Sequence, residues 1–125
     1  SCIMRRERTN TPLQALLLMN DPQYVEAARH FAERVLREAE SDSENRIRWA
    51  FEQVTLRQPQ VEEMEELLGA LRDFRISYQK EIGLAEELIS VGELRTNEKF
   101  EPRELATWTM MGNLLLNLDE VVTKE

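Results

Sequence analysis

Five polar side chains near the two ends of the chain have no evident local role, and their types could bind a ligand or another chain. They are Arg8, Asn10, Asn113, Asn117 and Asp119. Guanidinium and amide groups donate hydrogen bonds, and amide and carboxylate oxygens accept them. Asn113 and Asn117 are four residues apart, which places both on one face of a helix. We therefore predict that the five side chains meet and tie the N-terminal segment to the end of the domain.

His30 is the single histidine, with Glu26 four residues before it and Glu33 three residues after it. In a helix these three side chains would share one face. A carboxylate-bridged di-metal site needs two Glu-x-x-His segments and further carboxylates, and a structural zinc site needs several cysteine or histidine ligands. One histidine and one cysteine, Cys2, supply neither set. We predict a surface histidine among charged neighbours, and neither a metal nor another cofactor.

Other patterns that would indicate a reaction or a ligand are missing from the sequence. No serine stands in the glycine-flanked turn that exposes a nucleophile, no Cys-x-x-Cys-His haem attachment occurs, and the four glycines form no phosphate loop. The net charge is −8, with the acidic excess in the second half, whereas nucleic-acid binding requires a basic surface. No apolar run approaches about 18 residues, so no membrane insertion is expected.

Four glutamates stand at the start of segment 61–80; they are Glu62, Glu63, Glu65 and Glu66. Carboxylate oxygens can bind hard cations, but the segment lacks the Asp, Asn and Gly pattern of a calcium loop. The helix dipole favours acidic residues in the first turns of a helix. We interpret the four as a solvated helix face, and an acidic protein-binding surface is the alternative interpretation.

The stretch TNTPLQALLLMNDP, residues 9–22, places polar residues on both sides of a short apolar run. Thr11 has the position of a helix N-cap, and Gln14 that of its capping-box partner. Asn20 suits the left-handed end of that helix, and Asp21 suits the N-cap of the next one. We therefore predict structural capping roles for these four side chains.

Apolar residues recur at spacings of three and four, the period of amphipathic helices. The pattern predicts helices over residues 12–19, 22–40, 44–55, 61–80, 84–91 and 102–118. Ser41 and Glu44 have capping-box spacing before the third helix, and Phe100 and Leu105 have the positions of a hydrophobic staple before the last one.

The last predicted helix has an unusually wide apolar face, which covers an arc of about 160° on a helical wheel. Its members are Leu105, Trp108, Met111, Leu115, Leu116 and Leu118, and the opposite side holds Asn113, Asn117, Ala106, Thr109 and Met110. So wide an arc predicts a helix near the middle of the fold. The fold class we expect is all-α, an irregular or orthogonal bundle of five to six helices in one domain over residues 1–125.

The chain begins at Ser1 rather than at a methionine and runs directly into RRERTNTP. We expect it to be an excised C-terminal fragment of a larger protein, in which residues 1–10 form an arm from the preceding region.

Three stretches resemble one bacterial family. RTNTPLQALLLMNDPQYVEAAR near the start, RIRWAFEQVTLRQPQVEEMEELL in the middle and ELATWTMMGNLLLNLDEVVTKE at the end are similar to the C-terminal helical domain of unknown function of large planctomycete-type proteins. Those proteins also carry cytochrome c-like segments, and the resemblance implies an exported or periplasmic setting. It implies no catalytic residue. The sequence departs from the pattern at Arg57, where glycine is expected, and at Gln60, where a Thr or Ser cap is usual.

The function we expect is that of a non-catalytic structural or interaction module that packs against other domains of its own polypeptide, with no oligomeric state indicated. The alternative is an accessory wall of a hydrolytic or redox active site that another domain completes. In that case Arg8, Asn10, Asp21, Asn113, Asn117 and Asp119 would bind substrate. Convergence of these groups in an open cleft would favour the enzyme, and a closed hydrogen-bond network would favour the structural module.

Overall fold

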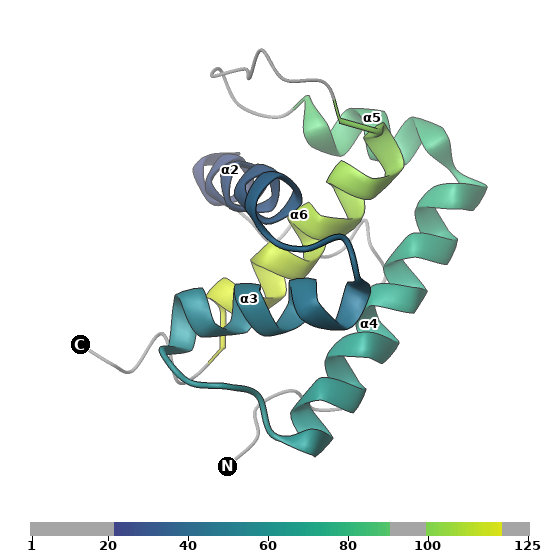
Figure 1. Cartoon of the computed structure of the whole chain (residues 1–125). Helices are drawn as coiled ribbons and strands as arrows, with labels where there is room; N and C mark the ends of the chain where they lie inside the picture. The colour runs from purple at the N-terminus through teal and green to yellow at the C-terminus, as the bar shows by residue number, and fades with distance from the viewer. Residues whose placement is uncertain (1–21, 91–99, 119–125) are drawn as a thin grey trace.

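A central helix, α6 (Pro102–Leu116), contacts each of the four other helices that the structure describes. The structure is a computed structural model that describes residues 22–90 and 100–118. In these ranges the chain forms α2 (Pro22–Glu38), α3 (Ser43–Thr55), α4 (Val61–Lys80), α5 (Ile82–Ile89) and α6, and no strand. Figure 1 shows α6 between α2 on one side and α4 on the other. The prediction of an all-α fold is confirmed; the predicted helix over residues 12–19 lies outside the described residues.

The helix boundaries agree with the predicted ones within two residues, and α4 has the predicted bounds. Asp42, rather than Ser41, caps the start of α3, because its carboxylate accepts a hydrogen bond from the Asn45 backbone N–H at 3.0 Å. The prediction that Ser41 caps this helix is therefore wrong by one residue. Aspartate and serine satisfy the same free amide groups, so the residue types alone did not separate the two positions.

Helix α6 begins at the predicted residue, with the predicted apolar residues on either side of its start. Glu101 is the N-cap and accepts a hydrogen bond from the Glu104 N–H at 2.9 Å, and Pro102 is the first helical residue. Phe100, just before the cap, is half-buried and packs against the core, while Leu105 is buried in the first turn. The two apolar residues thus occupy the two positions of a hydrophobic staple.

The first part of α6 is buried on every side, from Leu105 through to Gly112. Ala106, Thr109 and Met110, which the helical wheel places on the side away from the apolar arc, are buried as well. The helix has no solvent side here because its neighbours surround it. The Thr109 hydroxyl donates to the Leu105 carbonyl oxygen at 2.7 Å, so this buried polar group is satisfied within the helix.

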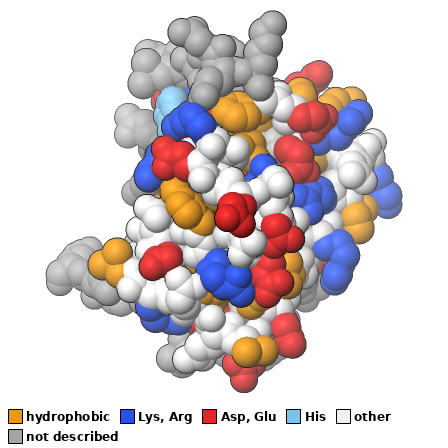
Figure 2. Space-filling model, in the orientation of Figure 1, with side chains coloured by type: hydrophobic (Ala, Val, Ile, Leu, Met, Phe, Trp, Pro, Cys, Tyr) orange, Lys and Arg blue, Asp and Glu red, His pale blue; other side chains and the backbone are white. Residues whose placement is uncertain are grey.

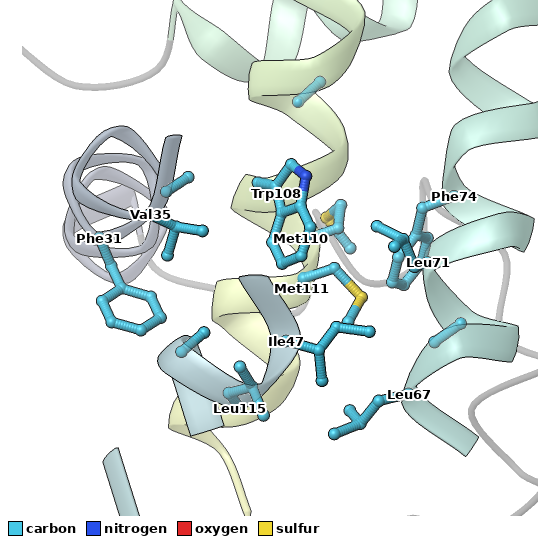
Figure 3. Packing of buried hydrophobic residues seen from close by; sticks show 14 of the residues in the cluster. Phe31, Val35, Ile47, Leu67, Leu71, Phe74, Trp108, Met110, Met111 and Leu115 are labelled. Carbon is cyan, nitrogen blue, oxygen red and sulfur yellow. The ribbon is translucent and has the colours of Figure 1, made fainter. Parts of the chain in front are cut away.

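Gly112 of α6 lies against α2 with no room for a side chain. A Cβ atom at this position would lie 3.1 Å from Cδ2 of Phe31 and 3.3 Å from the carbonyl oxygen of Ala28. The neighbouring core is built from larger side chains, and Figure 3 shows Trp108 of α6 between Val35 of α2 and Phe74 of α4. Glycine at this crossing therefore lets the two helices pack closely.

The turn between α3 and α4 begins with a leucine in the left-handed conformation. Leu56 has φ 64°, ends α3, and leaves 79% of its surface exposed. The left-handed conformation costs an L-amino acid roughly 1–2 kcal/mol, because Cβ lies too close to the following carbonyl oxygen. Arg57, where the family resemblance leads one to expect glycine, directly follows this left-handed residue.

Replacing Gly112 with valine should lower the free energy of unfolding by about 2–3 kcal/mol, because the added side chain overpacks the crossing of α2 and α6. The matched control is Gly83→Ala in α5, where no atom lies within 4 Å of the added Cβ. That variant should be as stable as the parent chain or up to about 1 kcal/mol more stable. Urea unfolding followed by circular dichroism measures both. Equal stability of Gly112→Val and the parent would contradict the close packing.

Replacing Leu56 with glycine should raise the free energy of unfolding by about 0.5–1 kcal/mol. Relief of the left-handed strain outweighs the greater freedom of glycine in the unfolded chain. Leu56→Ala is the control, since it removes the same exposed side chain but keeps Cβ and therefore the strain. The same urea titration compares the two, and a glycine variant no more stable than the alanine variant would show that the turn is unstrained.

Candidate functional site

The predicted polar residues fall partly outside the described structure. Seven of the nine lie in ranges that the structure does not describe: Arg8, Asn10, Thr11, Gln14, Asn20, Asp21 and Asp119. Asn113 and Asn117 lie at the end of α6, where the Asn117 Nδ2 donates to the Asn113 carbonyl oxygen at 2.6 Å and to its Oδ1 at 3.1 Å. The two amides therefore bond each other, and the five-residue network stays a prediction.

A second cluster, which the sequence did not predict, joins three helices around Arg75 of α4. Its Nε donates to Oε2 of Glu104 at 2.8 Å, and its NH2 donates to Oε1 at 3.0 Å, a two-point contact with the first turn of α6. Its NH1 donates to the Ser43 hydroxyl at 3.2 Å, at the start of α3. Arg46 adds a more distant ion pair to Glu104 at 3.9 Å. We call these four residues the Arg75 cluster.

The Arg75 cluster keeps Glu104 ionised. Burial by itself raises the pKa of this carboxyl, but the hydrogen bonds and charge of Arg75, with the charge of Arg46, outweigh it and lower the pKa below its ordinary value of 4.5. The same contact raises the pKa of Arg75, against the effect of its burial. Arg75 and Glu104 are 29 residues apart, so no local spacing in the sequence could have indicated the pair.

A third charged contact fixes the turn between α3 and α4. Arg57 donates from NH1 and NH2 to the two carboxylate oxygens of Glu63, at 3.0 and 2.9 Å, and its guanidinium carbon lies 4.9 Å from the centre of the Phe51 ring. Glu63 also accepts from the Gln60 N–H at 2.8 Å. Glu63 is only 6% exposed, so the prediction of a solvated face is wrong for this glutamate. Its position as the third helical residue was the signal for a capping role.

The surroundings of Glu63 lower its pKa, as those of Glu104 do. The hydrogen bonds from Arg57 are the largest cause and lower the pKa of Glu63, the Gln60 N–H lowers it further, and burial opposes both. Glu62 and Glu65, in contrast, are exposed, as the sequence predicted.

His30 lies at the surface of α2 between two glutamates. Its Nε2 lies 3.8 Å from Glu26 and its Nδ1 lies 3.4 Å from Glu33, with 41% of the histidine side chain exposed. Beside them, the buried Arg29 donates from NH1 to the Ile89 carbonyl oxygen at 2.9 Å, which ties α2 to the end of α5. No three His, Cys, Asp or Glu side chains of the described residues are grouped so as to hold a metal ion.

A groove of about 410 Å³ runs along α4 beside the Arg75 cluster. Its apolar lining comes from Leu68, Leu71 and Ile76, and two arginines, Arg72 and Arg75, also line it. An apolar lining with guanidinium groups suits an apolar side chain next to a carboxylate, so the groove could bind a segment of protein.

The described chain is thus a helical domain whose buried charges join its helices to one another. Comparison with known families identifies it further: the chain belongs to PSD1, a family of proteins of unknown function (DUF1553), which matches residues 1–71. The sequence expectation is confirmed at the level of a domain of unknown function, while the resemblance of the C-terminal stretch lies outside the matched residues. No curated protein and no solved structure shows significant similarity to the chain. Within the described ranges, no helix has the length and apolar character needed to cross a bilayer.

Replacing Glu104 with glutamine should make the free energy of unfolding depend less on pH in the acidic range. Because the pKa of Glu104 is lowered in the folded state, its stabilising effect is complete above the ordinary glutamate pKa and is lost as the pH falls through the lowered value. The variant should therefore be about 1–2 kcal/mol less stable than the parent near pH 7, and the gap should shrink between about pH 5 and pH 3. Urea unfolding at a series of pH values measures this.

The control for that variant is Glu44→Gln, which breaks an exposed ion pair with Arg48 at 3.2 Å. An exposed pair contributes about 0–1 kcal/mol, so this variant should follow the parent curve closely. If the free energies of unfolding of Glu104→Gln and the parent differed by the same amount at every pH, the Arg75 cluster would not perturb the pKa of Glu104.

Proposed function

We propose that the chain is a non-catalytic packing module that holds together parts of a larger polypeptide. The observation that carries this proposal is the use of Arg75. A guanidinium beside a groove could bind a ligand, yet it makes two hydrogen bonds to Glu104 and one to Ser43. Its hydrogen-bonding capacity is directed toward joining α3, α4 and α6, as expected of a structural group.

The other charged and amide contacts support the same role. Arg57 and Glu63 fix the turn before α4, Arg29 ties α2 to α5, and Asn117 bonds Asn113 within α6. On this proposal Arg8, Asn10 and Asp119 complete a closed network with the two asparagines instead of binding a substrate.

The surface of the domain supports contact with other protein. Large apolar side chains are exposed at four described positions: Leu56, Val61, Ile76 and Ile82. Figure 2 shows hydrophobic side chains at the surface among intermixed acidic and basic ones. Leu56 combines an exposed apolar side chain with a left-handed backbone, and the backbone conformation costs stability in the isolated chain. Contact with another domain would bury the side chain and offset that cost.

The wider setting that we propose follows from the resemblance described above. The parent polypeptide would be an exported bacterial protein of planctomycete type that carries cytochrome c-like segments, with this domain packed against them or against other neighbours. Detection of the full-length protein in a periplasmic extract would support this setting, and its recovery with cytoplasmic markers alone would contradict it.

The packing role is tested by binding in trans. The remainder of the parent polypeptide, produced without residues 1–125 of this chain, should bind the chain in isothermal titration calorimetry. Leu56→Gly should weaken this binding about tenfold or more while stabilising the free chain, since it removes an apolar anchor from the contact. The control Gln53→Ala, at an exposed position on α3, should bind as the parent chain does. Absence of binding in trans, or equal binding of Leu56→Gly, would contradict the proposal.

A further inference from the structure

The exposed side of α4 carries a regular stripe of apolar and charged side chains. At 100° per residue, five side chains lie within an arc of about 80°: Val61, Glu65, Leu68, Arg72 and Ile76. Their spacings of four, three, four and four residues are those along which two helices pair. Val61 is 73% exposed and Ile76 is 45% exposed. We call these five residues the α4 stripe.

The charges on the α4 stripe have no partner in the described part of the chain. Glu65 and Arg72 are exposed, and neither makes a hydrogen bond or an ion pair with a described residue. In the α4 stripe, Glu65 stands in the first half of α4 and Arg72 in the second half. The stripe therefore carries opposite charges in its two halves, which is the arrangement that an antiparallel copy of the same helix complements.

We propose that two copies of this chain associate through antiparallel α4 helices. A two-fold axis places each residue opposite the one that lies equally far on the other side of the axis. The midpoint between Val61 and Ile76 along the helix falls between residues 68 and 69. The midpoint between Glu65 and Arg72 falls at the same place. A single axis at that point places Val61 against the partner's Ile76 and Glu65 against the partner's Arg72, twice each, with Leu68 beside the axis.

The groove along α4 provides the room that this pairing needs. It follows the second half of the helix, where Leu71 and Ile76 give it apolar walls and Arg72 and Arg75 line it as well. Under the proposed two-fold axis, the first turns of the partner helix face this groove. They bring an apolar side chain, that of the partner's Val61, and a carboxylate, that of the partner's Glu65. On the side of the molecule formed by α4, at the right of Figure 2, hydrophobic and basic side chains lie close together at the surface.

The expected association is weak and reversible. A contact made mainly by one helix pair is smaller than a standard interface, so we expect a dissociation constant of about 10 μM or weaker. Sedimentation velocity of the 125-residue chain, from about 10 μM to about 1 mM, should show a shift from monomer to dimer.

Charge reversal at the α4 stripe provides the decisive experiment. Glu65→Arg alone and Arg72→Glu alone each place like charges opposite one another, and each should weaken the dimer at least tenfold. An equimolar mixture of the two variants should form a heterodimer with the affinity of the parent, because both contacts again join opposite charges. The double variant E65R/R72E should likewise form a homodimer of parental affinity. Both positions are exposed, and circular dichroism checks that each variant is folded.

The matched control is Asp73→Arg, an exposed residue of α4 that lies about 100° from the middle of the α4 stripe and changes the net charge by the same amount as Glu65→Arg. It should dimerise as the parent does. A parent chain that stays monomeric over the whole concentration range, a dimer unaffected by either reversal, or a mixture that stays monomeric would each overturn the proposal.

Discussion

The burial of α6 on all sides, from Leu105 through to Gly112, is the constraint on which the rest of the structure depends. A helix that contacts four others must accept close neighbours in every direction, and its composition follows from this. Gly112 allows α2 to approach, and Ala106 leaves no bulk on a side that an ordinary surface helix would turn to water. Thr109 is tolerated because its hydroxyl bonds the helix's own backbone. Loss of any one neighbouring helix would expose part of this surface.

The charged groups are arranged around this apolar centre by one recurring device. Glu104 in α6 and Glu63 in α4 are both the third residue of their helix, where free backbone N–H groups and the helix dipole favour a negative charge. In each case an arginine outside that helix makes a two-point contact with the carboxylate. Each of these glutamates therefore has a lowered pKa despite burial. The helix starts are thereby fixed to their neighbours.

Local patterns in the sequence predicted the elements well, and contacts between distant residues poorly. Periodicity gave the bounds of α4, and the positions of Phe100 and Pro102 gave the start of α6. The helical wheel of α6 placed Ala106, Thr109 and Met110 opposite the apolar arc, but a wheel alone does not show that other helices cover that side as well. The Arg75–Glu104 pair joins positions 29 residues apart, which no spacing rule links. The left-handed turn at Leu56 was not predicted, because its residue is a leucine instead of the glycine that such a backbone favours.

The net charge of the chain and the pattern of α4 act in opposite directions on self-association. Two copies each carrying a net charge of −8 repel one another at long range, so association requires a surface where the local charges differ from the average. In the α4 stripe, Arg72 provides such a local positive charge and Glu65 provides its complement. Added salt would weaken both the general repulsion and the local attraction, so a change of affinity with salt does not separate the two. Reversal of a single charge changes only the local contribution appreciably, and for this reason it separates a specific α4 pairing from non-specific association of acidic chains.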